Sequence, residues 1–287
     1  MDEATANPKM ATDNDDKFSS NDAAVDDTED LSDDFVEMQK TISNERRREK
    51  NAHGHGISDL LPFQFAPNIR PLTISDLESC VALENAAFAN PNHRCSKEKF
   101  EYRLTSCSEL SMGVFCTVVP AKAHAESFDM DTLGTARPVE TGRDDGAVSM
   151  LMAHIIATRS HDDVVTDDAM GLPLPQHSGG SSDEKGVEQR QRQRLGNQES
   201  GRTLCIHSLA VHPKVQGVGI GKLILKAYLQ QVKNSDLADR VALICQEYLI
   251  NYYKRFGFTH AGPSKASFGG GGWHDMTFQL GRSLSST

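Results

Sequence analysis

Gln216, Gly219 and Gly221 lie between an apolar segment at residues 202–211 and a helical pattern at residues 220–234. Glycine lets the backbone approach a ligand closely and adopt conformations that other residues avoid. The first N–H groups of a helix have no intrahelical acceptor, and the helix dipole favours an anion there. The spacing Q-x-x-G-x-G therefore predicts a cradle for a phosphate or pyrophosphate, although a glycine-rich turn that binds nothing has the same pattern.

Two other phosphate-binding loops fit this segment poorly. A dinucleotide fingerprint requires G-x-G-x-x-G with an acidic residue about twenty positions on; Asp236 and Asp239 lie in that range, but the glycine spacing differs. A Walker loop requires a hydroxyl residue after its Gly-Lys pair. Leu223 follows Gly221 and Lys222, so no hydroxyl is available there for magnesium.

The elements that must position this loop follow from hydrophobic patterning. Apolar, β-branched segments predict strands, and apolar residues at helical spacing predict helices. In the second half of the chain we expect strands at 202–211 and 241–246, helices at 220–234 and 247–256, and two last strands at 256–262 and 274–281. Gly257 is well placed to end the second of these helices.

The first half predicts a similar alternation. We expect a strand at 68–72, a helix at 73–88, a loop at 90–95, a helix at 96–106, and strands at 111–119 and 147–159. Thr73, with Asp76 at capping-box spacing, and Ser96 are expected to cap the two helices. The stripe expected to face the core from the first helix consists of Ile74, Leu77, Val81 and Phe88.

Several segments lack the apolar residues that a core requires. Residues 1–37 hold 13 acidic side chains against 2 lysines, and we expect them to be disordered. Residues 38–50 could form a short polar helix, and the HGHG at 53–56 is interpreted as linker rather than as a metal site. Residues 120–146 are expected to be an insertion, and residues 160–201 a mobile surface loop.

Composition excludes several classes of protein. Outside the first 37 residues, 27 acidic and 28 basic side chains nearly balance, so no basic surface for nucleic acid is expected. No stretch approaches the roughly 18 apolar residues of a membrane span, and MDEATANPKM lacks the apolar core of a secretory signal. The six cysteines contain no C-x-x-C pair and are expected to be buried free thiols. We therefore expect a cytoplasmic protein.

At the loop and around it the sequence resembles the GNAT superfamily of N-acetyltransferases, and within it the arylalkylamine (serotonin) N-acetyltransferases. The segments that carry the resemblance are SELSMGVF at 108–115, HSLAVHP at 207–213, QGVGIG at 216–221, YYKRFGF at 252–258 and AGP at 261–263. The resemblance covers most of the expected core and neither the acidic tail nor the insertions. It implies an acetyl-CoA-dependent enzyme.

The resemblance assigns roles to particular residues. Strand backbone at Leu209, Ala210 and Val211 would face the pantetheine and the acetyl carbonyl. His207 matches one of two histidines used for proton removal; the other position, two residues earlier, holds Cys205. Tyr253 matches the tyrosine near the CoA sulfur. The pyrophosphate would be held by Gln216, Gly217, Val218, Gly219, Ile220, Gly221 and Lys222.

These residue types suit acetyl transfer to an amine. A primary amine with a pKa of about 10.4 must lose a proton before it can attack, and a histidine with a pKa near 6.5 can receive it. Cys205 and His207 alternate onto one strand face. Tyr253 could protonate the leaving thiolate, while strand amides stabilise the oxyanion. Alternatively, His207 could be a buried core histidine and Tyr253 a packed aromatic residue, whereas His212 is interpreted as a turn residue.

The acceptor pocket is less sharply defined by the sequence. By resemblance, helix 73–88 and the loop up to Cys95 would cover it, and Trp273 occupies an aromatic position of the arylalkylamine pocket. With Phe88, Trp273 could sandwich an indole or phenyl ring, or it could simply pack against a strand end. Members of this subfamily also acetylate polyamines, whose distal ammonium groups Glu84 and Asp275 could receive.

Taken together, the sequence predicts a mixed α/β chain with the GNAT fold, a mostly antiparallel sheet splayed around an acetyl-CoA cleft and flanked by helices. We expect a tail and linker at 1–65, an acetyltransferase domain at 66–282 and a C-terminal tail at 283–287. The expected reaction is acetyl transfer from acetyl-CoA to an arylalkylamine, without a metal, membrane or nucleic acid. The alternatives are a polyamine acetyltransferase and a non-catalytic acetyl-CoA-binding protein; the acidic tail could have a separate partner.

Overall fold

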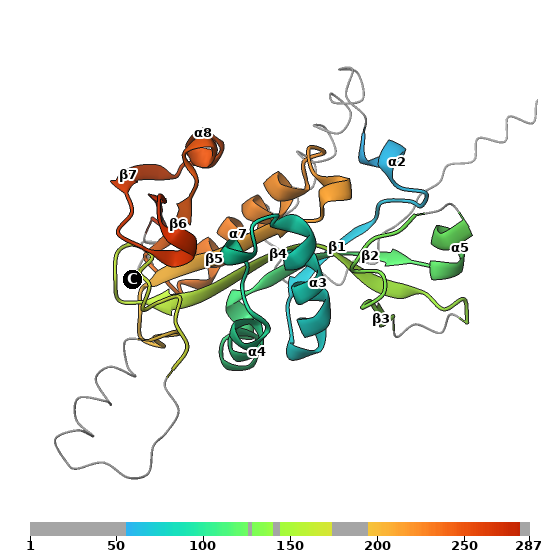
Figure 1. Ribbon diagram of the computed structural model, residues 1–287, viewed down its shortest axis with the longest axis horizontal. Helices are drawn as coiled ribbons and strands as arrows, with labels where there is room; N and C mark the ends of the chain where they lie inside the picture. The colour runs from blue at the N-terminus through green and yellow to red at the C-terminus, as the bar shows by residue number, and fades with distance from the viewer. Residues whose placement is uncertain (1–55, 126–127, 140–143, 174–194, 282–287) are drawn as a thin grey trace, which may run out of the picture. The chain divides into compact units, whose positions relative to one another are not determined.

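A mixed eight-stranded sheet organises the chain (Figure 1). The computed structural model describes residues 56–125, 128–139, 144–173 and 195–281. The path through the sheet is β1-β2-β4-β5-β6-β8-β7, with β3 paired to β4 outside it. The strands are β1 (Pro67–Pro71), β2 (Met112–Val118), β3 (Arg137–Pro138), β4 (Val148–Ser160), β5 (Thr203–Val211), β6 (Arg240–Cys245), β7 (Thr259–Pro263) and β8 (His274–Gln279).

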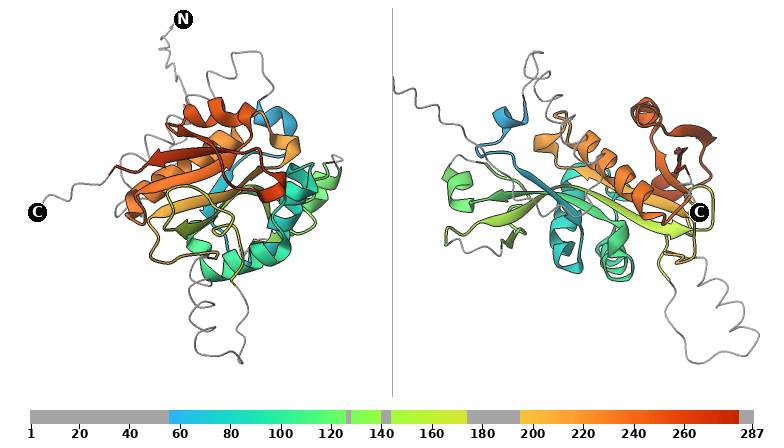
Figure 2. Two further views of the ribbon diagram at one scale, coloured as in Figure 1. Left: turned by 60° about the vertical axis from the view of Figure 1, so that its left-hand side comes forward. Right: turned by 180° about the vertical axis from the view of Figure 1, so that it is seen from behind.

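Helices cover both faces of this sheet. Figures 1 and 2 show α3 and α4 on one face and α7 on the other. The α-helices are α2 (Ile57–Leu60), α3 (Leu77–Ala87), α4 (Lys97–Ser106), α5 (Pro120–Ala125), α7 (Ile220–Ser235) and α8 (Ile250–Lys254). Short 3₁₀ turns are η1 (Ile74–Asp76), η2 (Pro91–His93), η3 (Ser108–Leu110), η4 (Pro213–Val215), η5 (Glu247–Leu249) and η6 (Phe268–Gly270).

Most pairings are antiparallel, and the exception matters for the site. Strands β4 and β5 pair antiparallel from Ser160–Thr203 to Ala153–Val211. Strands β5 and β6 pair parallel, because α7 connects them across one face of the sheet. The mixed α/β fold expected from the sequence is therefore present, with the predicted strands and the main helices close to their expected ranges.

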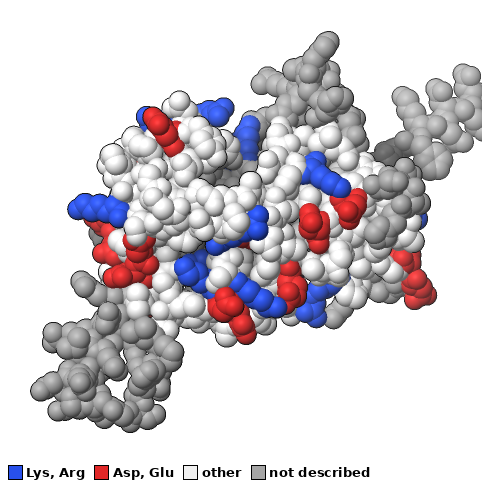
Figure 3. Space-filling model, in the orientation of Figure 1, with Lys and Arg blue, Asp and Glu red and all other residues white. Residues whose placement is uncertain are grey.

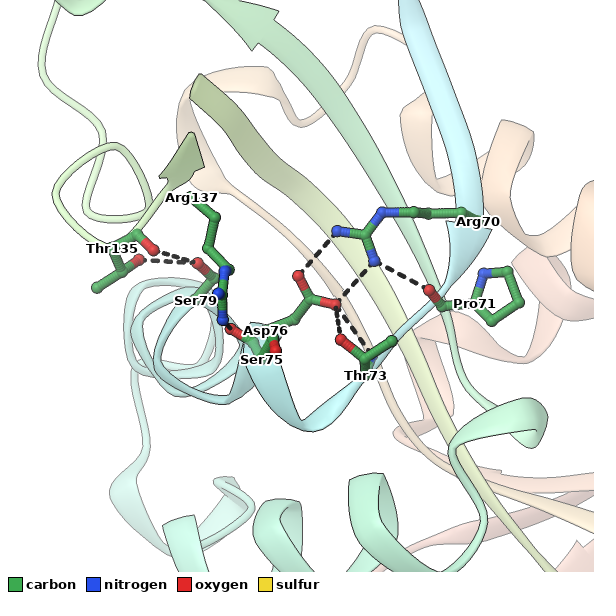
Figure 4. A network of polar contacts seen from close by, with 8 residues as sticks. All are labelled: Arg70, Pro71, Thr73, Ser75, Asp76, Ser79, Thr135 and Arg137. Atoms are coloured by element: carbon green, nitrogen blue, oxygen red, sulfur yellow. Dashed lines mark hydrogen bonds and ion pairs between the residues drawn. The ribbon is translucent and has the colours of Figure 1, made fainter. Parts of the chain in front are cut away.

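The start of α3 is fixed by a polar network (Figure 4). Arg70 on β1 binds Asp76 with two guanidinium nitrogens, each 2.8 Å from a carboxylate oxygen. The same carboxylate accepts the backbone N–H of Thr73 at 2.9 Å, which completes the expected capping box. Burial opposes ionisation of Asp76, but the hydrogen bonds from Arg70 and Thr73 and the charge of Arg70 together outweigh it and lower the pKa of this carboxyl. Ser79 on α3 bonds Thr135, which ties the helix to the segment before β3.

The core stripe predicted on the first helix is partly wrong. Ile74 is 46 % exposed, and Leu77, Val81 and Phe88 only flank the core cluster. The helix begins with the 3₁₀ turn η1, which rotates the buried face to other positions. The α3 residues that are buried are Ser79, Cys80, Leu83 and Glu84.

The two predicted insertions are more ordered than expected where the structure describes them. Residues 120–146 contain the short helix α5 and the strand β3. Val165, Ala169 and Met170 are buried against Cys205 and Ala242, so the first part of the expected surface loop belongs to the core. These apolar residues are interspersed among aspartates, so the segment has no apolar run in its sequence. The acidic tail, the 38–50 helix, most of the HGHG segment and residues 174–194 lie outside the described residues.

Candidate functional site

The sheet opens between β5 and β6. These strands pair only from Thr203–Arg240 to Ile206–Leu243, whereas β5 continues to Val211 alongside β4. In the described pairings, the β5 edge from His207 to Val211 therefore has no strand on its β6 side. An open strand edge presents N–H and C=O groups that an extended ligand can bind. Leu209, Ala210 and Val211 lie in this stretch, as expected.

His207 sits in a β-bulge at the start of the opening. Ile156 pairs with Ser208 and Ala157 with Ile206, so His207 is the extra residue of β5. Its Nε2 lies 2.7 Å from the Thr158 hydroxyl. Its Nδ1 is buried and has no hydrogen-bond partner. The Thr158 hydroxyl therefore holds one ring nitrogen, and the other nitrogen is left without a partner among the described residues.

The surroundings keep the His207 ring neutral. Burial, and then the positive charges of Arg103 and Lys99, lower the pKa of His207 well below its usual value. A neutral imidazole has one lone pair. If Nε2 donates its proton to Thr158, that lone pair is on Nδ1, the nitrogen without a partner.

Cys205 shares a sheet face with this histidine. Cys205 pairs with Thr158 across the β4–β5 ladder, and side chains directly opposite each other lie on one face. The Cys205 side chain is completely buried among Val165, Ala242 and their neighbours. Burial raises the pKa of its thiol to about 12. The thiol therefore stays protonated at neutral pH and offers no base in place of a second histidine.

The loop after β5 is built by its own polar contacts. His212 caps η4 by accepting the Lys214 N–H at 3.3 Å, and its other nitrogen lies 3.0 Å from Asp131. The turn role expected for His212 is thus its observed one. The Gln216 side chain donates to the Val211 carbonyl at 2.9 Å, which closes the loop against the strand end.

Two glycines then lead into α7. Gly217 and Gly219 have φ angles of 78° and 94°, in the region that favours glycine. Gly219 is the N-cap of α7, which begins at Ile220. The first backbone N–H groups of a helix lack intrahelical acceptors and carry positive partial charge. Val218, Ile220, Gly221 and Lys222 thus lie where an anion would be held.

Tyr253 follows β6, the strand on the other side of the opening from the free edge of β5. Strand β6 leads through η5 to α8, which carries Tyr253. Its ring packs against Tyr252 and Phe258 at 5.2 and 5.7 Å between centroids. Burial, followed by the neighbouring Tyr252, raises the pKa of its phenol well above the usual value. Tyr253 therefore keeps its proton at neutral pH, as a proton donor must.

Trp273 packs against two neighbouring rings of the chain. Its indole lies 4.9 Å from His93 and 6.4 Å from Phe268, measured between centroids, and its Nε1 donates to the Phe268 carbonyl at 2.7 Å. Phe88 instead packs against the α3–α4 core cluster. His93, Phe268 and Trp273 thus form an aromatic cluster, which the sequence did not predict.

Glu84 is a structural hub rather than a free carboxylate. It is 1 % exposed, and its Oε2 accepts the Ser208 hydroxyl at 2.7 Å and lies 3.1 Å from His154 Nε2. Its Oε1 accepts the Cys95 N–H at 2.8 Å. The expectation that Glu84 receives a distal ammonium is therefore wrong, because both oxygens are already bonded. Asp275 differs, since its Oδ1 is buried without a partner.

The described residues offer neither of two other kinds of site. They contain no group of three or more His, Cys, Asp or Glu side chains that could hold a metal ion. None of their helices has the length and apolar character needed to cross a membrane. Figure 3 shows Lys and Arg side chains interspersed with Asp and Glu over the face in view.

Comparison with known proteins assigns a class to this arrangement. Residues 189–280 match the Acetyltransferase (GNAT) domain family. This range contains the open edge of β5, the glycine loop, α7 and Tyr253. This part of the chain is therefore similar to GNAT acetyltransferase domains.

Serotonin N-acetyltransferases are among the individual proteins whose sequences are similar to this chain. The chain is 26 % identical to the serotonin N-acetyltransferase of Mesocricetus auratus over 206 residues, which cover 71 % of this chain and 73 % of that protein. It is 32 % identical over 73 residues to the human serotonin N-acetyltransferase, spanning 25 % of this chain and 35 % of that one. The match to the Macaca mulatta enzyme is 35 % identical and covers 24 % of this chain and 34 % of that protein. The chain thus has serotonin N-acetyltransferases among its relatives.

Solved structures give a weaker likeness. The ribosomal-protein-S18-alanine N-acetyltransferase from Escherichia coli is 12 % identical, covering 77 % of this chain and 99 % of that one with a TM-score of 0.42. The loading GNATL domain of CurA from Lyngbya majuscula is 13 % identical, covering 75 % of this chain and 98 % of that one with a TM-score of 0.47. At TM-scores below 0.5 these likenesses have no functional weight.

Proposed function

We propose that this chain transfers the acetyl group of acetyl-CoA to the nitrogen of a small primary amine, an arylalkylamine such as tryptamine or serotonin. The observation that carries the proposal is the open edge of β5 beside the glycine-rich start of α7. An extended thiol ester could bind along that edge while its pyrophosphate rests on the helix N-terminus. The serotonin N-acetyltransferase relatives support both the reaction and the acceptor class.

In this proposal the chain contributes backbone groups to the co-substrate. Leu209, Ala210 and Val211 would hydrogen-bond the pantetheine arm and the acetyl carbonyl. Amide groups already fixed in a strand stabilise the negative charge of the tetrahedral oxyanion without reorganisation. The loop from Gln216 to Lys222 would hold the pyrophosphate. The positive φ angles of Gly217 and Gly219 let successive N–H groups point to one place.

His207 would remove the proton from the amine. The attacking nitrogen must lose its ammonium proton before it has a lone pair. The unpaired Nδ1 of His207 could accept that proton directly or through one water. Thr158 acts as a positioning residue, since its hydroxyl holds the opposite ring nitrogen.

Tyr253 would return a proton to the departing thiolate. Its phenol is protonated at neutral pH, because burial raises its pKa. Tyr253 follows β6 and His207 lies in β5, so the proton donor and the proton acceptor would act from opposite sides of the opening. Direct attack then needs no covalent enzyme intermediate, and the buried Cys205 thiol needs no role in the chemistry.

The polyamine alternative keeps one supporting observation. Asp275 has a buried oxygen without a partner, so it could receive an ammonium group. Glu84 would not bind a second ammonium group, because its carboxylate is already bonded within the chain. The cations Lys99 and Arg103 on α4 would repel a polyamine. An acetyl-CoA-binding protein without turnover is the remaining alternative, since Cys205 stands where a second histidine would.

Free-thiol release from acetyl-CoA tests these alternatives. The acceptor panel is tryptamine, serotonin, phenethylamine, spermidine and spermine, with wild type, His207→Gln and the matched control His161→Gln. His161 is exposed, and its side chain bonds only Ser200 among the described residues. We expect ring-bearing amines to be favoured, and only His207→Gln to lose about 100-fold or more in kcat/KM, the range of a general base. Acetyl-CoA binding without thiol release from any amine would contradict the proposal.

A further inference from the structure

Arg103 is a buried cation that has no anionic partner in the part of the chain that the structure describes. Its side chain on α4 is 2 % exposed. One terminal nitrogen donates to Cys95 Sγ at 3.3 Å and the other to the Met170 carbonyl at 3.2 Å. Its Nε is buried and bonds nothing. Buried guanidinium groups are normally paired with a carboxylate, because an isolated buried charge is costly.

Lys99 adds a second positive charge on the same helix. It lies one turn before Arg103 and is half-buried, with its ammonium 5.4 Å from the centre of the Phe268 ring. Burial and then Arg103 lower the pKa of Lys99. Among the described residues, no salt bridge joins either cation to a carboxylate. Like charges four residues apart on a helix destabilise it.

Both cations border the acceptor side of the site. Cys95 and Met170, which Arg103 contacts, belong to the loop before α4 and to the apolar cluster around Cys205. Phe268, beneath Lys99, is stacked with Trp273. Both charges also act on His207, where they oppose its protonation. The proton acceptor of the proposed reaction is thus acted on by two positive charges, of which Lys99 is partly offset by the nearby Asp167 carboxylate.

We propose that the acceptor is an amino carboxylate, with its carboxylate bound by Arg103 and Lys99 and its amine presented to His207. The inference rests on the proposed function and narrows its acceptor class. A guanidinium with a free N–H is the group that recognises carboxylates best in proteins. The cluster of His93, Phe268 and Trp273 beside Lys99 favours an aromatic side chain, as in phenylalanine or tryptophan.

The bound carboxylate would also assist the chemistry. Its negative charge offsets Arg103 and Lys99, the two cations that, after burial, lower the pKa of His207. Protonation of His207 becomes easier when the acceptor is in place, so the base gains strength only in the complete complex. The same charges act against polyamines, which bring further positive charge to the site.

Paired acceptors test this directly in the wild-type protein. Tryptophan is compared with tryptamine, and phenylalanine with phenethylamine and with phenylalanine amide, which lacks the charge. A charge-assisted hydrogen bond corresponds to about 10- to 100-fold in an equilibrium constant. We expect kcat/KM to be higher by about that factor for the amino acids. An equal or lower value, with the amines still acetylated, would overturn this inference and leave the proposed function standing.

Two variants assign the effect to Arg103. Arg103→Gln should abolish the preference for amino acids, and Arg103→Lys should retain part of it. Lys97→Gln is the matched control on α4, because Lys97 is exposed and, within the described ranges, forms its one salt bridge with Glu78. Binding of 3-phenylpropionate, followed by calorimetry, gives a readout independent of turnover and should be weakened by Arg103→Gln alone. If neither acceptor class yields free thiol, the proposed function itself fails. If Arg103→Gln keeps the full preference, Arg103 is not the carboxylate site.

Discussion

Replacement of Glu84 should be the most damaging single change near the site. Its carboxylate accepts hydrogen bonds from the Cys95 N–H and the Ser208 hydroxyl, and it lies within hydrogen-bond distance of His154 Nε2. Glu84, His154 and Ser208 are 1, 0 and 4 % exposed, so water cannot replace the lost acceptor. Each buried polar group left unpaired costs about 1–3 kcal/mol. We therefore expect Glu84→Ala to lower the free energy of unfolding by about 3–5 kcal/mol.

The assay is urea and thermal denaturation of the purified chain. For a domain of 150–250 residues, 1 kcal/mol shifts the melting temperature by about 2–4 °C, so the expected loss is about 6–20 °C. Glu78→Ala on the same helix is the matched control. Glu78 forms an exposed salt bridge with Lys97, and such pairs contribute little. If Glu84→Ala unfolds too readily to study, Glu84→Gln, which keeps the volume and one acceptor oxygen, should show a smaller loss.

The same network predicts a functional signature. Glu84 fixes the loop at Cys95 and the residue after the His207 bulge, so its loss should raise the KM for the amine more than that for acetyl-CoA. In a double-mutant cycle, Glu84→Ala and Ser208→Ala should be non-additive, because they remove the same hydrogen bond. A Glu84→Ala variant within about 1 kcal/mol of wild type, or strict additivity with Ser208→Ala, would refute this account of the network.

Further predictions concern ionisation, the glycine loop and the phenol. The pKa of His207 is lowered in the folded chain, so the unfolded chain takes up a proton there first as pH falls below about 6.5. Wild type should therefore lose stability relative to His207→Gln over that range. Urea midpoints of both proteins at pH 8 and 5.5 check this, and an equal change in the two midpoints would contradict it. The pKa of Asp76 is also lowered, so its contribution to the free energy of unfolding should be complete above about pH 4 and disappear as pH falls through the folded-state pKa. Asp76→Asn should therefore make the urea midpoint less dependent on pH between about pH 5 and 2.5. Gly219→Ala, at a φ of 94°, should cost about 1–2 kcal/mol and weaken acetyl-CoA binding in calorimetry; unchanged affinity would remove the loop from the site. Tyr253→Phe should lower kcat about 100-fold with little change in the KM for acetyl-CoA, whereas Tyr248→Phe, at an exposed position, should match wild type in the same steady-state assay.

Local signals were enough to predict most of the fold. Apolar, β-branched segments identified the strands, and Thr73, Ser96 and Gly257 marked helix ends by their capping chemistry. Those signals act within a few residues of the element that they define. Errors arose where tertiary packing decides burial, as at Ile74, which the 3₁₀ turn directs to solvent, and at Val165, which the core takes up from a polar segment.

The candidate site was predicted only in part for the same physical reason. His207 lies in β5 and the glycine loop follows that strand directly, so one sequence motif contains both. Arg103 and the Glu84 network come from α3, α4, β4 and β5, and no local pattern reports that they meet. A helical arginine is usually solvated, and only the three-dimensional structure shows that this one is buried without a carboxylate.

The central claim is that the open edge of β5 positions acetyl-CoA for direct transfer to an amine. Mass spectrometry of a single-turnover mixture of purified chain, acetyl-CoA and one acceptor, tryptamine or tryptophan in separate reactions, tests it most directly. The account predicts an N-acetylated acceptor and free CoA in equal amounts, with no acetyl group on the protein, and a sharply reduced yield from His207→Gln. Binding of acetyl-CoA with no acetylated acceptor in either reaction, or an acetyl group left on the chain, would contradict it.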